Sequence, residues 1–204
     1  MNHTQLTELA VKWLKRPNSQ NGHGCLISAS ELRSGWDGEI PDAIGFRLDG
    51  NIVTSIVVEA KATRSDFLCD KKKEHRQSGM GDYRYYICPE GLIKPEELPE
   101  KWGLLWVNAR GHIKVISGAA NTFGGHWQLK NEALISLRFA GDKQREQWLL
   151  VKILSRVGDV EQMNRWIKES KLIANRVIKE RDKLQVELKT LRLQIWNSTH
   201  RVVA

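Results

Sequence analysis

The chain has 204 residues and a formal net charge of +8, and its 41% apolar and 27% charged residues predict one globular domain with an appendage. No stretch approaches the roughly 20 continuous apolar residues that cross a bilayer, and no apolar signal core opens the chain, so we expect no membrane partner. The three widely spaced cysteines (Cys25, Cys69 and Cys88) suit neither a disulfide framework nor a zinc site, so we expect a cytoplasmic protein.

The first predicted elements are a short helix and a short strand. Thr4 is a candidate N-cap for an amphipathic helix whose apolar side ends with Leu14, and Pro17 stops the helix. A strand is expected at residues 25–30, and a polar loop follows it.

A β-hairpin comes next. Residues 42–48 form its first predicted strand and residues 51–61 its second. Asp49-Gly50 is the predicted two-residue turn, because this dipeptide tolerates a positive φ.

The remainder of the domain alternates between helix and strands. A helix is expected over residues 65–76, and a strand at 83–88. Residues 102–108 and 112–116 form a second predicted hairpin, whereas the glycine-rich residues 117–130 give no clear pattern.

The composition changes after Gly141 toward Glu, Lys, Arg, Gln and Leu, without proline. We therefore divide the chain into a domain at residues 1–141 and a basic helical tail at residues 142–204. The tail carries 14 Lys and Arg against 8 Asp and Glu, so +6 of the net +8 lies there. Such a charge favours a polyanionic partner such as nucleic acid without proving one.

A 3–4 spacing of apolar residues runs through the tail over about five heptads. Nine of these eleven positions are apolar: Val160, Met163, Ile167, Ser170, Ala174, Val177, Arg181, Leu184, Leu188, Leu191 and Ile195. The pattern predicts a coiled coil that joins copies of the chain through residues 160–196, with a parallel dimer as the expected form. A long solvated single helix is the alternative.

The heptad frame is fixed by the strongest end of this pattern. Leu184 and Leu191 occupy d positions, and Leu188 occupies an a position. Glu187 then falls at g and Arg192 at the following e, which is the spacing of an interhelical ion pair in a parallel dimer.

The residues that carry chemistry are Asp42 and, 17 positions later, Glu59 and Lys61. Side chains alternate across a strand, so Glu59 and Lys61 share one face, and the hairpin register sets Asp42 near or slightly beyond the level of Glu59. Two carboxylates and a lysine at one strand end suit a hard divalent cation such as Mg²⁺ (or Mn²⁺). A surface charge cluster is the alternative interpretation.

The chemistry assigns a role to each of these residues. Asp42 and Glu59 would hold the metal, with the carbonyl of Ala60 as a third ligand. A metal ion lowers the pKa of a bound water and neutralises charge on the scissile phosphate. Lys61 would orient or help deprotonate that water, or stabilise the oxyanion.

At these residues the sequence resembles the PD-(D/E)xK nuclease superfamily, written here Pro41-Asp42, sixteen residues, then Glu59-Ala60-Lys61. Within it, the sequence is similar to the MmcB-like DNA-repair family and its phage-encoded relatives. The stretches PDAIGF, VVEAKATRSDFLCDKKK, GMGDYRYYICPEGLI and LPEKWGLLWV carry this resemblance, over roughly residues 24–116. It implies an α/β restriction-endonuclease-like core, in which a mixed sheet is flanked by helices, and a metal-dependent deoxyribonuclease.

The resemblance also implies an additional active-site carboxylate, Glu31, although an exposed strand-end residue is an equal alternative. Basic residues after the motif are candidates for DNA phosphate contacts: Arg64, Lys71, Lys72, Lys73 and Arg76. A solvated basic face is the alternative for this group. The tract 74–76 departs from the family, where an aromatic residue is more typical, which weakens the DNA contacts assigned there.

Three functions follow from these observations. The first is Mg²⁺-dependent hydrolysis of DNA phosphodiester bonds, in repair or in phage or prophage DNA processing. The second is a non-catalytic DNA-binding module that keeps the nuclease fold and recruits partners through its coiled coil. The third is a structural adaptor built around the coiled coil, which would neither bind nor cut DNA.

Overall fold

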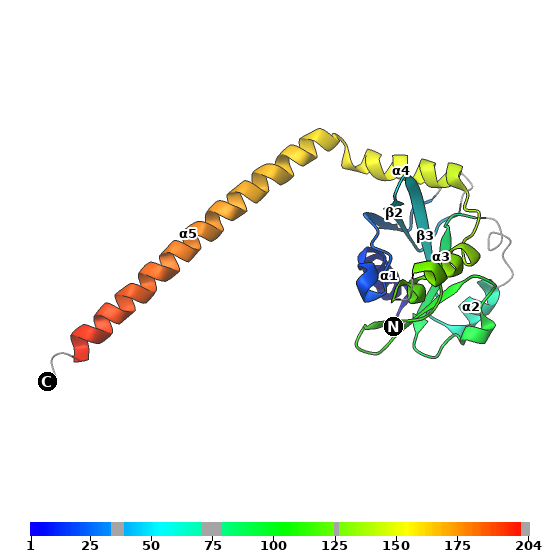
Figure 1. The fold of residues 1–204 in the computed structure, drawn as a ribbon, viewed down its shortest axis with the longest axis horizontal. Coiled ribbons are helices and arrows are strands. Elements are labelled where there is room, and N and C mark those ends of the chain that lie inside the picture. Colours follow the sequence, from blue (N-terminus) through cyan, green and yellow to red (C-terminus); the bar gives the residue numbers. More distant parts are fainter. Residues whose placement is uncertain (34–38, 71–78, 125–126, 201–204) are drawn as a thin grey trace. The chain divides into compact units, whose positions relative to one another are not determined.

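The computed structural model describes residues 1–33, 39–70, 79–124 and 127–200 (Figure 1). Its elements are, in chain order, α1 (His3–Lys15), η1 (Asn18–Gln20), β1 (Ile27–Ser30), β2 (Ala43–Asp49), β3 (Ile52–Ala60), α2 (Arg64–Asp70), β4 (Tyr83–Pro89), η3 (Pro95–Glu97), β5 (Gly103–Val107), β6 (Ile113–Ser117), η4 (Ala119–Gly124), α3 (Trp127–Ser136), α4 (Lys143–Val157) and α5 (Val160–His200). Among the described residues, no helix is both long enough and apolar enough to span a membrane.

The chain forms two compact units, residues 1–153 and 154–204, and the division falls within α4. Residues 142–153 belong to the first unit because Leu149 of α4 is fully buried against the sheet. The second unit consists of the last residues of α4 and the 41-residue helix α5.

Six strands build one mixed sheet in the first unit, in the order β1-β2-β3-β4-β5-β6. The first three strands are mutually antiparallel, β3, β4 and β5 are parallel, and β6 is antiparallel to β5. The fold is therefore α/β, with a mixed sheet flanked by helices and followed by a long C-terminal helix, which confirms the coarse prediction.

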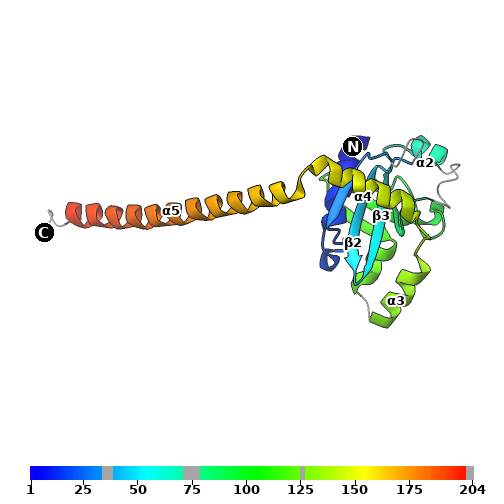
Figure 2. The ribbon, with the colours of Figure 1, turned by 90° about the horizontal axis from the view of Figure 1, so that it is seen from above.

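Alternate residues of β3 pack on opposite faces of the sheet, as predicted. Ile56, Val58 and Ala60 join the apolar side of α1, which buries Leu6, Ala10, Trp13 and Leu14. Val57 instead packs with Leu149, and Figure 2 shows α4 lying over β2 and β3 on this face. Helix α2 covers the same face further along, where its Phe67 packs against Tyr86.

Two local details differ from the sequence prediction. Asn2, not Thr4, caps α1, because its side chain accepts the Gln5 N–H while the Gln5 side chain accepts the Asn2 N–H. The hairpin turn is Gly50-Asn51, one residue later than predicted. Asp49 still pairs with Ile52, and Gly50 takes the positive φ of 61°.

The unassigned region 117–130 contains η4 and the start of α3. η4 begins with two buried alanines, and the Ala120 N–H donates to the hydroxyl of Tyr85 over 2.8 Å. No local periodicity marks η4, because the burial of its first two residues depends on packing against β4.

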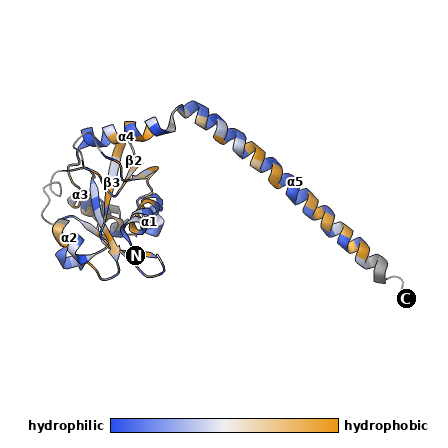
Figure 3. Ribbon diagram, turned by 180° about the vertical axis from the view of Figure 1, so that it is seen from behind, coloured by the Kyte–Doolittle hydropathy of each residue, from blue (hydrophilic) through white to orange (hydrophobic). Residues whose placement is uncertain are grey.

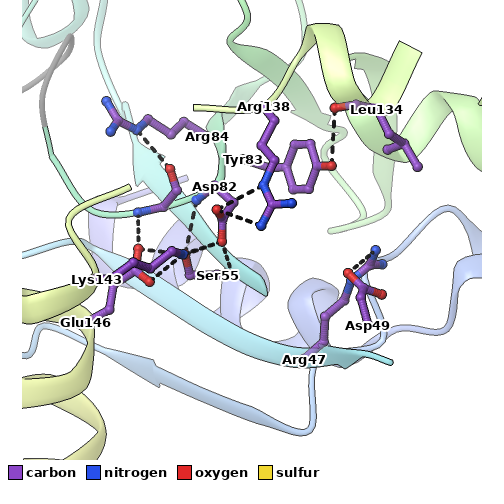
Figure 4. Close-up of polar contacts among 11 residues, drawn as sticks. Arg47, Asp49, Ser55, Asp82, Tyr83, Arg84, Leu134, Arg138, Lys143 and Glu146 are labelled. Atoms are coloured by element: carbon purple, nitrogen blue, oxygen red, sulfur yellow. Dashed lines mark hydrogen bonds and ion pairs between the residues drawn. The ribbon is translucent and has the colours of Figure 1, made fainter. Parts of the chain in front are cut away.

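A buried polar cluster anchors the start of α4 to the sheet (Figure 4). The Glu146 carboxylate accepts the Gly81 N–H at 2.8 Å and the Ser55 hydroxyl at 2.6 Å. Lys143 donates to Glu146 at 2.8 Å and to Asp82 at 2.5 Å. Burial alone would raise the pKa of Asp82, but the hydrogen bonds from Lys143 and Ser55 outweigh it and lower this pKa.

Candidate functional site

The register of β2 and β3 sets two acidic residues opposite each other at one end of the hairpin. Ala43 pairs with Val58, so one further step puts Asp42 opposite Glu59. Glu59 is next to last in β3, and Lys61 follows the strand directly. This position of Asp42 agrees with the level expected from the sequence.

A pocket of about 400 Å³ opens at this end of the hairpin. It is lined by side chains from α1, the residues before β2, the end of β3 and α2: His3, Glu39, Ile40, Asp42, Glu59, Lys61 and Asp66. Four carboxylates therefore share the pocket with one lysine and one histidine. Carboxylates in this excess attract positive charge, so the pocket suits a cation.

The Asp42 carboxylate is held by contacts to two different elements. One oxygen, Oδ2, accepts the N–H of Ala60 in β3 at 2.7 Å. The other, Oδ1, lies 3.2 Å from Nε2 of His3, the first residue of α1. These contacts fix the direction of a side chain that is 18% exposed, so its oxygens stay turned toward the pocket.

Lys61 and Glu59 line the same pocket from the end of β3. The Lys61 Nζ lies 3.7 Å from Oε2 of Glu59, and both side chains are largely buried. The backbone N–H of Lys61 donates to the carbonyl of Ile87 in β4 at 2.9 Å, which extends the parallel pairing one residue past β3. The sheet thus sets the position from which the lysine reaches into the pocket.

Asp42 and Glu59 fit a small hard cation by the kind and number of their donors. Mg²⁺ takes oxygen ligands and often only one or two protein carboxylates, with waters and substrate phosphate completing the shell. The Ala60 carbonyl projects from the same strand edge as the Ala60 N–H that Asp42 accepts. Within the described part of the chain, no three His, Cys, Asp or Glu side chains are arranged to hold a metal, so protein donors would be this pair and the carbonyl.

Arg84 adds a buried positive charge behind this site. It lies in β4 beside Val57, and its guanidinium donates to the Gly79 carbonyl at 2.7 Å and lies over the Phe139 ring. Burial lowers the pKa of Arg84, while the charges of Glu39, Glu146 and Glu59 oppose that shift. Arg84 therefore partly offsets the negative charge of the pocket from the protein side.

Glu31 does not line the pocket. It follows β1 with a positive φ of 52°, and its side chain is exposed. Its backbone N–H does contact the Asp42 carbonyl at 3.3 Å, so the main chain brings it beside the site.

Of the basic residues proposed for DNA contact, the structure describes only Arg64. Arg64 is engaged with Glu97 through both of its terminal nitrogens and also donates to the Leu92 carbonyl, so it turns away from the pocket. Its hydrogen bonds lower the pKa of Glu97 to about 2. Lys71, Lys72, Lys73 and Arg76 lie outside the described residues.

Three polar residues of the pocket were not singled out as site residues from the sequence: His3, Glu39 and Asp66. Asp66 is the acidic residue in the first turn of α2. The distance of His3 and Glu39 from the ExK motif along the chain gives no spacing signal, since α1 and the segment before β2 reach the pocket only through tertiary packing.

No known protein family matches the sequence, and no curated protein matches it. Among solved structures, a protein of unknown function from Silicibacter pomeroyi is similar with 17% identity and a TM-score of 0.45, over 79% of this chain and 94% of that one.

Proposed function

We propose that this protein is a metal-dependent deoxyribonuclease with a PD-(D/E)xK-type core, acting in DNA repair or in phage or prophage DNA processing. One observation carries the proposal: Asp42, Glu59 and Lys61 line a single carboxylate-rich pocket at the end of the β2–β3 hairpin. The motif spacing that suggested a nuclease therefore corresponds to side chains that lie together.

Asp42, Glu59 and Lys61 would have different roles in phosphodiester hydrolysis. Asp42 and Glu59, with the carbonyl of Ala60, would hold Mg²⁺ or Mn²⁺. When bound, such an ion lowers the pKa of a water ligand and offsets charge on the phosphate. Lys61 orients the attacking water or helps to remove its proton, or it stabilises the negative charge that develops on the phosphate.

DNA is the proposed substrate, and the distribution of charge supports it. The chain carries +8 overall, of which +6 lies in residues 142–204, so a polyanion is attracted even though the pocket itself is acidic. We also propose that the protein acts as a homo-oligomer joined through residues 160–196.

The proposal is tested with labelled single-stranded, nicked, flapped and duplex DNAs in Mg²⁺ or Mn²⁺. We expect cleavage of at least one substrate, lost on chelation, and a rate about 10²–10⁴-fold lower for Lys61→Ala. Lys12→Ala is the matched control, because Lys12 is exposed and does not line the pocket.

A non-catalytic binding module and an adaptor give different results in the same assay. DNA binding without cleavage under every condition would identify the binding module. Absence of both binding and cleavage would identify the adaptor.

A further inference from the structure

Helix α5 is uninterrupted over 41 residues, which corresponds to roughly 60 Å. Figure 3 shows apolar segments recurring between hydrophilic ones along the coloured part of this helix. The a and d residues of the predicted coiled coil are exposed: Met163, Ile167, Val177, Leu184, Leu188 and Leu191 are between 38% and 59% exposed. Such a row of exposed aliphatics on one helix requires a partner.

Two surface grooves on α5 repeat with the period of a coiled coil. The first is lined by Met163, Trp166, Ile167, Ser170 and Lys171, and the second by Val177, Glu180, Arg181, Leu184, Gln185 and Leu188. Every residue of the first groove has a counterpart in the second exactly two heptads later, and all of them occupy a, d, e or g positions. A coiled-coil partner inserts its side chains between residues of this kind.

The residues that flank the a and d positions show which partner fits. The g positions are Trp166, Ile173, Glu180, Glu187 and Gln194, and the e positions are Asn164, Lys171, Ile178, Gln185 and Arg192. Every charged g residue is thus acidic, and every charged e residue is basic. In a parallel pair g faces e of the other helix, whereas in an antiparallel pair g faces g and e faces e. In the parallel arrangement no g–e contact joins like charges, and Glu187 meets the basic Arg192, whereas an antiparallel arrangement gives these acidic and basic residues no contact with each other.

We propose that the occupant of this face is a second copy of α5, aligned parallel and without stagger. In this register Glu187 faces Arg192 of the second copy, and Ile173 faces Ile178 of the second copy. Trp166 then faces Lys171 of the second copy, a pair in which an ammonium group can lie over an aromatic ring. These apolar contacts at e and g positions add to the interface in the first half of α5. There the small residues Ser170 and Ala174 occupy a and d positions and bury little apolar surface.

Arg181 is the one charged residue at an a position of the proposed coil. An ion pair within α5 reduces the free energy that burying this charge would cost. Its guanidinium pairs with the neighbouring Asp182, with contacts of 3.0 and 2.6 Å to one carboxylate oxygen. Asp182 occupies a b position, so the charge is turned away from the a and d row. A charged a residue lowers stability but restricts register and strand number.

The arrangement has a consequence for the proposed nuclease, and this step alone rests on that function. Both copies enter α5 from its N-terminal end, so a parallel pair tethers both copies of the first unit to the same end of the coil. One DNA molecule could then engage two catalytic pockets.

Disulfide trapping tests the register. In the full chain with exposed Cys69 replaced by serine, Leu188→Cys puts a thiol at an a position, and Thr190→Cys is the matched control at a c position on the outer face. We expect mild oxidation to join most of the Leu188→Cys chains into covalent dimers and few of the Thr190→Cys chains. Equal trapping at both positions, or none at Leu188→Cys, would overturn the proposal.

A charge exchange tests orientation without relying on a thiol. Glu187→Arg and Arg192→Glu each create two like-charge contacts in a parallel dimer, so each should weaken dimerisation about fivefold in sedimentation equilibrium. The double variant should return to the wild-type affinity. Failure of that rescue, or a wild-type mass other than twice the 23.4 kDa of one chain, rejects a parallel two-stranded coil whether or not the protein cuts DNA.

Discussion

His23 is held neutral inside the first unit. It is fully buried among Trp13, Tyr83 and Tyr85, and its Nε2 lies 2.8 Å from the Tyr85 hydroxyl. That hydroxyl accepts the Ala120 N–H, so its own hydrogen is available for the imidazole. Burial and, to a smaller extent, the charge of Arg47 lower the pKa of His23 well below 6.5.

This environment predicts that the protein is less stable in acid. A group whose folded pKa is depressed binds its proton more readily in the unfolded state, so stability is full above pH 6.5 and falls as the pH drops below it. For one proton the slope reaches about 1.4 kcal/mol per pH unit. Urea unfolding between pH 7 and pH 5 measures it.

Replacing a histidine by phenylalanine at two positions separates the contribution of His23 to this pH dependence from that of an exposed histidine. His23→Phe should remove most of this slope, whereas His112→Phe, at an exposed histidine, should keep the wild-type slope. Identical slopes for His23→Phe and the wild type would show that His23 does not cause the pH dependence.

Asp42, Glu59 and Lys61 were predictable from the sequence as pocket residues, but the other polar residues of the pocket were not. The three share one hairpin, so strand alternation and register were enough to bring them together. His3 and Glu39 come from segments whose placement depends on α1 packing on the sheet and on the path of the chain into β2. No local pattern encodes those contacts.

At the scale of elements, α4 depends on a few buried polar groups as well as on Leu149. Glu146 is 3% exposed and accepts hydrogen bonds from Gly81, Ser55 and Lys143. Glu146→Ala should therefore lower the free energy of unfolding by about 2–3 kcal/mol, because it leaves buried donors without their charged acceptor. Chemical denaturation measures the change.

A matched control lies one residue earlier in the same helix. Arg145 pairs with Asp142 at the surface, so Arg145→Ala should cost under about 1 kcal/mol. Similar losses for Arg145→Ala and Glu146→Ala would mean that the polar cluster does not anchor α4.

The elements with a clear period were predictable, and those without one were not. The alternation of residues in β3 predicted which side chains lie on each face of the sheet. The 3–4 spacing predicted that α5 begins at Val160, as it does in the structure. The hairpin turn was misplaced by one residue because Asp49-Gly50 and Gly50-Asn51 both suit a tight turn, and only pairing distinguishes them. The helix α3 has no strong apolar side, so its sequence gave no signal.

At the scale of the molecule, the acidic pocket and the basic residues occupy different parts of the chain. The acidic pocket belongs to the first unit, while most of the net positive charge lies in the tail. This division fits the proposed nuclease, because an acidic pocket attracts a cation while a basic tail attracts DNA. A composition shift after Gly141 revealed the tail from the sequence, but the packing of Leu149 assigns the first part of α4 to the first unit.

We propose that Asp42 and Glu59 act together in metal-dependent cleavage. Asp42→Asn and Glu59→Gln keep side-chain shape and remove charge, and the Asn oxygen can still accept the Ala60 N–H, so both variants should fold. The decisive measurement is the rate of Mg²⁺-dependent cleavage by each variant, with DNA binding recorded in parallel. We expect both rates to fall to that of the enzyme-free control while binding is unchanged or tighter, because less negative charge faces the phosphate. Wild-type cleavage by either variant would contradict this proposal.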